Sequence, residues 1–284
     1  MSLEQAIWEC KKYNNKNGIL NKDDGVECNM CKNKGYIMYK FEDEDLGDWD
    51  VRTKKCTCMV QRESSLRALR SGLGEYLNKT SKDYIAIDDW QKDNKNKMIS
   101  YCQNDIESDK WFIGCGQSGS GKTLLVSIIA NYLLKNFNKE VRYVTWTDFI
   151  SQLKRDMLGD NSNQVSKYLD EIKNAEVLFL DELLKIYNQT DLKYAIEIIN
   201  YRYNNNLKTL ITSEHSLKEL LKIDEATFGR VIEKSKEYVV EIPKDSTKNY
   251  RLKNKYWRGN NGQLFYKKDI SSHHQRQRWC NKSD

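Results

Sequence analysis

An eight-residue segment of this chain has the residue types and spacing that bind phosphate groups. It reads GQSGSGKT over residues 116–123, matches the pattern G-x-x-x-x-G-K-[ST], and follows the apolar run WFIGC at 111–115. In such a loop the glycines let backbone N–H groups surround phosphates, and the N-terminus of the following helix adds positive charge. Lys122 would reach the β- and γ-phosphates of a nucleotide, and the Thr123 hydroxyl would bind Mg²⁺.

The alternative is a Gly/Ser surface turn before an ordinary helix. Short patterns occur by chance, but here an apolar strand, the loop and an apolar helix follow in the order that the chemistry requires, which favours nucleotide binding. The expected nucleotide-binding residues are Gly116, Gln117, Ser118, Gly119, Ser120, Gly121, Lys122 and Thr123.

Two adjacent acids follow a second apolar run, VLFLDE at 177–182. Asp181 and Glu182 therefore emerge at the C-terminal end of a buried strand, the edge where open α/β sheets bind ligands. Asp181 suits the Mg²⁺ shell together with Thr123, and Glu182 suits polarising the attacking water. Alone, such a strand end is more often a solvated turn. Together with the loop upstream, it predicts an ATPase.

Four of the eight cysteines form two close pairs near the N-terminus: Cys28 and Cys31 in CNMC, and Cys56 and Cys58 in CTC. Two pairs separated by a loop are typical of a tetrahedral four-cysteine zinc site, in which the metal replaces a core in a small module. The second pair has the spacing C-x-C rather than C-x-x-C, and Cys10 is a possible substitute ligand. The alternative is four unrelated thiols.

Alternating apolar patterns predict the elements that position these residues. Runs with strand character at 110–115, 141–146, 176–180 and 208–212 alternate with helical patterns at 123–137 and 191–203. This order predicts an α/β domain with a parallel sheet flanked by helices. The segment 61–80 has the pattern of a helix that ends near Gly72 and Gly74, followed by a linker. We expect a zinc module with a linker helix at 1–75, an ATPase domain at 76–255 and a tail at 256–284.

The formal net charge of +6 belongs to the C-terminal end of the chain. Residues 244–284 hold eleven Lys and Arg against three Asp, whereas the other 243 residues carry a net charge of −2. Between residues 253 and 284 these basic groups alternate with Tyr256, Trp257, Phe265, Tyr266 and Trp279, a combination that binds single-stranded DNA. The alternative is a disordered or core-packed tail whose charges keep it soluble.

The composition excludes a membrane-spanning protein. Charged residues make up 31% of the chain, and it has no apolar run near 18 residues. The first residues, MSLEQAIWECKKYNNK, also lack the apolar stretch of a secretory signal. We therefore expect a cytoplasmic protein.

The motifs GQSGSGKT, VLFLDE, TLITSEHSL, FGRVIEKS and KNYRLK, in this order, resemble those of AAA+ helicase loaders of the DnaC/DnaI type, especially the versions carried by phages of Gram-positive bacteria. The resemblance covers about residues 25–253. It implies a protein of a bacterial cell or a phage-infected bacterium that binds a hexameric replicative helicase and helps to place it on single-stranded DNA. It also implies that chains associate through a shared ATP site and that the zinc module contacts the helicase.

The resemblance also implies roles for three residues. Glu214 follows the strand TLITS at the sensor-1 position, where many AAA+ proteins have Asn. Arg230 in FGRV matches the arginine finger that would reach the ATP of a neighbouring subunit. Arg251 in NYRL matches sensor 2, which contacts phosphate within the same chain. The alternative for each arginine is a surface residue or a structural ion pair.

Two other functions remain open from the sequence. One is a DNA-binding protein that uses ATP as a switch with little turnover, and the other is a transposition helper ATPase of the IstB type. Glu182 and Arg230 favour ATP hydrolysis, whereas the acid at position 214 is compatible with a switch that hydrolyses little ATP. The cysteine module favours a loader over a transposition helper.

Overall fold

A computed structural model describes residues 1–43, 47–158, 162–253, 256–258 and 264–266. The chain divides into two compact units, Met1–Gly72 and Leu73–Asp284. The expected boundary at residue 75 falls in a short 3-10 turn, Gly74–Tyr76, just after this division.

The first unit consists of three helices and a β-hairpin. Its helices are α1 (Leu3–Asn15), α2 (Asn21–Asp24) and α3 (Cys58–Arg70), and its strands are β1 (Tyr36–Asp43) and β2 (Asp48–Lys55). The strands pair antiparallel, with Tyr36 opposite Lys55. The hairpin was not predicted. The helix predicted from residue 61 instead begins at Cys58 and ends at Arg70, before Gly72.

The second unit contains a five-stranded parallel sheet with the strand order β4-β5-β6-β3-β7. Its strands are β3 (Phe112–Gly116), β4 (Val141–Thr145), β5 (Val177–Asp181), β6 (Lys208–Thr212) and β7 (Val239–Ile242). The predicted α/β fold with a parallel sheet is confirmed, and four strands lie where they were predicted, within one or two residues. The short strand β7 was missed.

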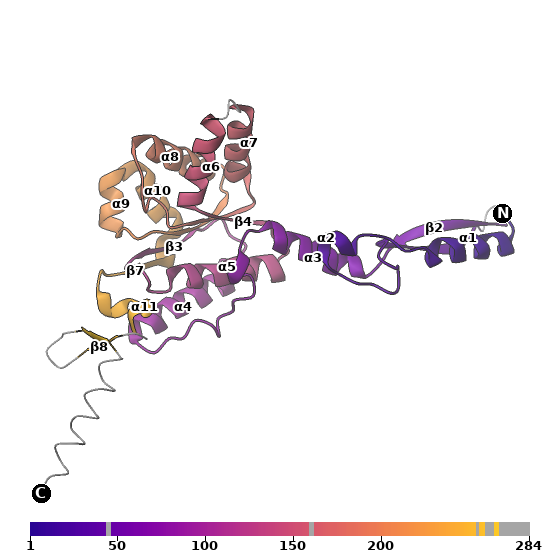
Figure 1. The fold of residues 1–284 in the computed structure, drawn as a ribbon, viewed down its shortest axis with the longest axis horizontal. Coiled ribbons are helices and arrows are strands. Elements are labelled where there is room, and N and C mark those ends of the chain that lie inside the picture. Colours follow the sequence, from indigo (N-terminus) through magenta and orange to yellow (C-terminus); the bar gives the residue numbers. More distant parts are fainter. Residues whose placement is uncertain (44–46, 159–161, 254–255, 259–263, 267–284) are drawn as a thin grey trace, which may run out of the picture. The chain divides into compact units, whose positions relative to one another are not determined.

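Helices cover both faces of this sheet (Figure 1). On one face lie α4 (Asp89–Asn104) and α5 (Lys122–Asn136). The other face carries α6 (Trp146–Leu158), α7 (Ser162–Asn174), α8 (Gln189–Asn204), α9 (Leu217–Ile223) and α10 (Glu225–Ser235).

The sheet can be covered on both faces because its strands are apolar on both faces. Successive side chains of a strand point to opposite sides. Leu178 and Leu180 of β5 therefore join the core under α6 to α10, together with Ile113 and Ile211 of the neighbouring strands. β3, β5 and β6 are buried along their whole length. The carboxyl ends of these buried strands form the edge at which the candidate site lies.

The last described elements are short. A 3-10 turn at Lys236–Tyr238 precedes β7, and another at Ser246–Lys248 precedes α11 (Tyr250–Lys253). Two strands, β8 (Tyr256–Arg258) and β9 (Leu264–Tyr266), pair antiparallel. The rest of the predicted DNA-binding tail lies outside the described residues. Within the described ranges, no helix is both long and apolar enough to cross a bilayer.

Candidate functional site

The loop between β3 and α5 wraps closely against the end of β7 and the segment that follows it. Gly116 has φ +98°, and a Cβ atom there would lie 2.0 Å from the Ile242 carbonyl oxygen. Gly119 has φ +69°, and a Cβ atom there would lie 2.1 Å from the Asn249 side chain. A Cβ atom at Gly116 would clash with backbone, one at Gly119 would displace the Asn249 side chain, and both positions have a positive φ. The backbone path therefore favours glycine at both positions, as a ligand does.

Lys122 and Thr123 begin α5 and point in different directions from it. Lys122 is 7% exposed, and its Nζ donates to the carbonyl oxygens of Gly116 and Gln117 at 3.0 and 2.6 Å. The ammonium group thus lies inside the curl of the loop, where burial lowers its pKa. A polyphosphate placed in the loop would offer this ammonium group a charged partner in place of the two carbonyls.

Asp181, the last residue of β5, is the centre of a set of hydroxyl groups. Its Oδ1 accepts hydrogen bonds from Thr123 Oγ1 at 2.9 Å and from the Thr212 hydroxyl, and its Oδ2 accepts one from Tyr143 at 2.9 Å. Burial raises the pKa of Asp181, although the three donors oppose this shift. The sequence predicted Asp181 and Thr123 as ligands of the same Mg²⁺ ion, and it did not predict the other two donors.

This arrangement fits a Mg²⁺ ion. Mg²⁺ prefers oxygen ligands and binds with a carboxylate, a hydroxyl and nucleotide phosphates in sites of this kind. Since Thr123 Oγ1 and Asp181 Oδ1 are 2.9 Å apart, both can reach one ion. A divalent cation would also offset the burial that disfavours the ionised carboxylate of Asp181.

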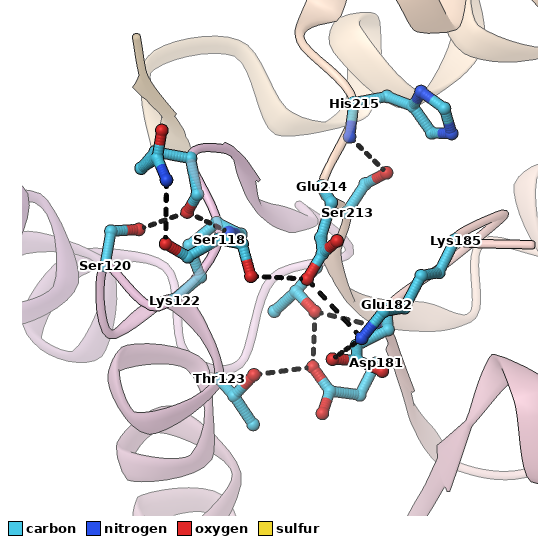
Figure 2. A network of polar contacts seen from close by, with 12 residues as sticks. Ser118, Ser120, Lys122, Thr123, Asp181, Glu182, Lys185, Ser213, Glu214 and His215 are labelled. Carbon is cyan, nitrogen blue, oxygen red and sulfur yellow. Dashed lines mark hydrogen bonds and ion pairs between the residues drawn. The ribbon is translucent and has the colours of Figure 1, made fainter. Parts of the chain in front are cut away.

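Glu182 and Glu214 lie beside this centre and share one lysine (Figure 2). Lys185 Nζ is 2.8 Å from Glu182 Oε1 and 3.5 Å from Glu214 Oε1. Glu214 Oε1 also accepts a 2.7 Å hydrogen bond from Ser118 Oγ in the phosphate loop. Burial by itself would raise the pKa of Glu214, but Ser118 and the charges of Lys185 and Lys122 outweigh it and lower this pKa.

A cavity of about 350 Å³ opens over the phosphate loop, a volume suited to a small ligand. Residues of the phosphate loop line it, together with aromatic and aliphatic side chains from segments before β3 and after β7. The lining residues are Tyr76, Asp83, Tyr84, Ile85, Ser118, Gly119, Gly121, Lys122, Thr123, Leu124, Glu182, Thr212, Ser213, Glu214, Tyr250 and Arg251.

The four clustered cysteines meet in the first unit, because the β1–β2 hairpin brings its two ends together. Cys28 Sγ lies 3.7 Å from Cys56 Sγ, and Cys31 Sγ lies 3.5 Å from Cys58 Sγ. All four sulfur atoms are within 4.8 Å of one another. A tetrahedral zinc site with Zn–S bonds of about 2.3 Å places its sulfur atoms roughly 3.8 Å apart. The cluster therefore has the dimensions of a zinc site.

The surroundings of the cluster also fit a metal. Burial would raise the pKa of Cys31, but a hydrogen bond from the Gly35 N–H and contacts with the other thiols lower it to about 7. Burial raises the pKa of Cys58 to about 12, and a bound cation would be needed to ionise this thiol near neutral pH. Cys10 is not part of the cluster in the described residues, so it is not needed as a substitute ligand.

A buried ion pair supports the two loops that carry these cysteines. Arg62 of α3 is 1% exposed, and its Nη1 lies 2.6 Å from Asp24 Oδ1. Its Nη2 donates to Asn33 Oδ1, which also accepts the Cys28 backbone N–H. Outside the cluster, burial raises the pKa values of Cys102 and Cys115 to about 12, so these thiols stay protonated, as expected of structural cysteines.

Comparisons with known proteins agree with this geometry. Residues 86–233 match the model of the bacterial DnaA ATPase domain, which is more than half of the chain. The chain belongs to this family. The family is one of AAA+ ATPases, so the fold implies a bound nucleotide.

Proteins similar to this chain confirm its resemblance to helicase loaders of the phage type. XkdC of the phage-like element PBSX of Bacillus subtilis strain 168 is 30% identical over 230 residues, covering 76% of this chain and 82% of that protein. The replicative helicase loader DnaC of Buchnera aphidicola subsp. Baizongia pistaciae is 29% identical over 173 residues, covering 58% and 69%. The crystal structure of the DnaC helicase loader matches with a TM-score of 0.51 at 24% identity, covering 59% of this chain and 98% of that one.

Two of the three residues singled out by the resemblance lie at the cavity of this AAA+ domain. Glu214 and Arg251 line it, and the backbone of Arg251's neighbour Tyr250 donates to Gly119 of the phosphate loop at 2.8 Å. Arg230 is not among the lining residues. It lies on α10, where its guanidinium donates to Asn200 of α8 and sits over the Tyr203 ring at 5.5 Å.

Three polar residues of the site were not found from the sequence. Tyr143, Thr212 and Lys185 contact Asp181 or Glu182 from β4, from β6 and from the turn after β5. Thr212 is the last residue of a predicted strand, and this strand lies next to β5. Its position at the strand end could therefore have marked it as a site residue. The contact of Tyr143 with Asp181 and that of Lys185 with Glu214 arise only when the strands lie side by side, so no local pattern marks them. The contact of Lys185 with Glu182 spans three residues, but a single i,i+3 pair is not a site pattern.

Proposed function

We propose that this protein is an ATP-dependent loader of a hexameric replicative helicase onto single-stranded DNA. The observation that carries the proposal is the contact of Thr123 with Asp181, beside Glu182 and the phosphate loop, in a chain homologous to helicase loaders. ATP binding and hydrolysis would switch the protein's grip on helicase and DNA. The protein is in this view an ATPase with Mg²⁺ and Zn²⁺ as cofactors.

Each part of hydrolysis has a residue suited to it. The loop N–H groups and Lys122 hold the β- and γ-phosphates, and Thr123 and Asp181 hold Mg²⁺, which neutralises charge that develops on the phosphates. Glu182, next in the chain, orients a water molecule toward the γ-phosphate and accepts its proton. Arg251 at the cavity wall contacts the phosphates from the same chain.

The position of Arg230 supports a role between subunits. An arginine outside its own chain's cavity but on a partly exposed helix surface can reach the ATP of a neighbouring chain, where it would stabilise the transition state. The ATP site is then shared, and self-association is required for full activity.

The cysteine cluster supports a separate zinc module. Four thiolates around zinc would hold the hairpin and α3 together without a large core, because metal binding supplies folding energy. The unit Met1–Gly72 also exposes several large apolar side chains, namely Trp8, Ile19, Met30, Val60 and Leu69. Exposed apolar groups on a small module suit a protein contact, which we assign to the helicase.

A switch with little turnover is the second candidate. The observation that favours it is the acid at position 214, whose charge lies close to where a γ-phosphate would bind. Measuring ATP hydrolysis with and without single-stranded DNA, and with and without the replicative helicase, separates the candidates. A loader hydrolyses ATP and responds to both additions. A switch binds ATP with little hydrolysis under every condition, and a transposition helper responds to DNA but not to the helicase.

The C-terminal tail would add affinity for single-stranded DNA. Its basic groups attract the backbone, and each base stacked on an aromatic ring contributes about 1–3 kcal/mol. A chain truncated after Lys253 should therefore bind DNA more weakly, with a smaller dependence on salt, while its affinity for ATP stays unchanged. Unchanged DNA affinity at low salt would contradict this role and leave the tail as a solubilising segment.

A further inference from the structure

The turn that follows β5 carries a lysine for which the proposed function has no role so far. The turn runs from Glu182 to Lys185, and the Lys185 N–H donates to the Glu182 carbonyl at 3.0 Å. Between them, Leu183 and Leu184 are fully buried. Glu182 and Leu184 have φ +55° and +57°, a region that residues other than glycine rarely occupy. Such a conformation persists only where the surroundings enforce it.

The segment after β6 enforces this conformation. Glu182 N–H donates to the Thr212 hydroxyl at 2.9 Å, and Leu183 N–H donates to the Thr212 carbonyl at 2.8 Å. Ser213 Oγ donates to the Leu183 carbonyl at 2.9 Å. These hydrogen bonds hold the backbones of both segments in place. The side chains of Glu182, Lys185 and Glu214 are therefore attached at fixed points of the backbone.

The side chains then form a continuous chain of polar contacts. Ser118 in the phosphate loop donates to Glu214 Oε1 at 2.7 Å, and Lys185 lies 3.5 Å from that same oxygen and 2.8 Å from Glu182 Oε1 (Figure 2). The three charged side chains are only 28–34% exposed, so water screens them less than a pair on the open surface. The loop that would hold phosphate is thus linked to the proposed general base.

The charges around the phosphate loop give this lysine a role. Glu214 contacts the loop, and Asp181 and Glu182 lie at the adjacent end of β5, where a triphosphate would add several negative charges. Lys122 and Mg²⁺ would offset the phosphates and Asp181, but Glu214 would still repel the γ-phosphate. Lys185 offsets part of the charge of Glu214, and its shorter contact holds Glu182 in one orientation.

We propose that Lys185 and Glu214 act as an oppositely charged positioning pair: Glu214 reports the state of the phosphate loop through Ser118, and Lys185 transmits it by orienting Glu182 for hydrolysis. The proposal rests on the proposed ATPase function. It also gives the acid at position 214 a use, because Lys185 and Ser118 reduce the charge that would oppose the phosphate.

A double-mutant cycle with Lys185→Met and Glu214→Gln tests the pair. Lys185→Met leaves both carboxylates unbalanced and should lower kcat for ATP hydrolysis by about tenfold or more, part of what a general base contributes. Glu214→Gln alone should cost less. The double variant removes both charges and should regain at least about threefold over Lys185→Met, since residues that act as a pair are not additive. Lys185→Arg, which keeps the charge, should retain most of the activity.

Four measurements separate this role from general damage. Lys92→Met is a matched control, because Lys92 forms an i,i+3 pair with Asp89 on the exposed surface of α4, and its kcat should equal that of the wild type. Thermal unfolding of each variant reports stability, and titration with a fluorescent ATP analogue and Mg²⁺ reports binding. In a Glu182→Gln background, Lys185→Met should lower kcat no further, because the group that it orients is already lost.

Four results would overturn the proposal: unchanged kcat in Lys185→Met, a higher kcat in that variant, additive losses in the cycle, or a loss that tracks thermal stability alone. A wild-type protein that binds ATP but does not hydrolyse it is a different result, since it contradicts the proposed ATPase function and removes the pair's role with it.

Discussion

At the residue scale, the proposed function assigns nucleotide binding and hydrolysis to different side chains. Lys122 lies inside the phosphate loop and is held there by two carbonyls, whereas Glu182 lies outside the loop at the start of the turn after β5. In the proposed reaction, the charge of Lys122 would meet the β- and γ-phosphates directly. Glu182 would act only on the attacking water, so its removal would leave the proposed Mg²⁺ ligands Thr123 and Asp181 in place.

Two substitutions should show this separation. Lys122→Ala should abolish measurable ATP binding, because it removes the buried charge that meets the phosphates. Glu182→Gln should keep ATP affinity within a few-fold of the wild type and lower kcat by about 10²- to 10⁴-fold, the usual contribution of a general base. Binding titrations and phosphate release measure the two effects. Normal hydrolysis by Glu182→Gln would show that this residue is not the base.

Sequence reasoning reached those residues that a local pattern reveals. The loop 116–123, Asp181 and Glu182 belong to two short motifs, and the structure brings both motifs to one cavity. Tyr143 and Lys185 could not be found in this way. Tyr143 reaches Asp181 because β4 lies beside β5, and Lys185 reaches Glu214 because the turn after β5 packs on the end of β6. Such contacts depend on strand order, which the sequence does not state.

At the element scale, strands that are buried on both faces were the easiest to predict. β3 and β5 are largely apolar runs, and β6 has the apolar pair Leu210 and Ile211 between threonines. Each was found within two residues of its bounds. β7 was missed because it has only four residues, VVEI, one of them an exposed glutamate. The β1–β2 hairpin was missed because its strands are largely exposed and carry many charges, so no buried face gives it an alternating pattern.

The hairpin and α3 should depend on zinc. We expect about one zinc ion per chain, bound by Cys28, Cys31, Cys56 and Cys58. Cys28→Ser should release zinc and weaken helicase binding while ATP binding persists, since the two compact units are separate. Cys10→Ser is the matched control and should keep zinc, because Cys10 lies outside the cluster. Elemental analysis checks the metal, and its absence from protein reconstituted with zinc would contradict the assignment.

At the scale of the whole molecule, one chain does not bring every group that the proposed reaction uses to the cavity formed by its own described residues. Arg251 lines its own chain's cavity, whereas Arg230 lies on α10 against Asn200 and Tyr203. A complete site would therefore combine the phosphate loop of one chain with the α10 surface of the next. Assembly would then control activity, which suits the proposed action on a ring-shaped helicase.

Mixing two inactive variants tests the shared site. Arg230→Ala lacks the guanidinium that would reach the ATP of the neighbouring chain. Lys122→Ala lacks the ammonium group that would bind ATP in its own chain. Mixed assemblies contain some interfaces with an intact Lys122 facing an intact Arg230, so they should regain part of the wild-type ATPase rate. If mixtures stay inactive under conditions where light scattering shows association, Arg230 has only a structural role.

The central claim is that ATP bound at this site drives loading of a helicase, and one measurement tests it directly. The hexameric replicative helicase is incubated with circular single-stranded DNA, ATP and the purified protein, and the helicase retained on the circles is quantified after gel filtration. A closed ring cannot thread onto a circle, so retention reports loading. We predict retention with the wild type and ATP, and at least about tenfold less with Lys122→Ala, since this variant loses the phosphate contact. Equal retention with Lys122→Ala, or with no protein added, would contradict the account.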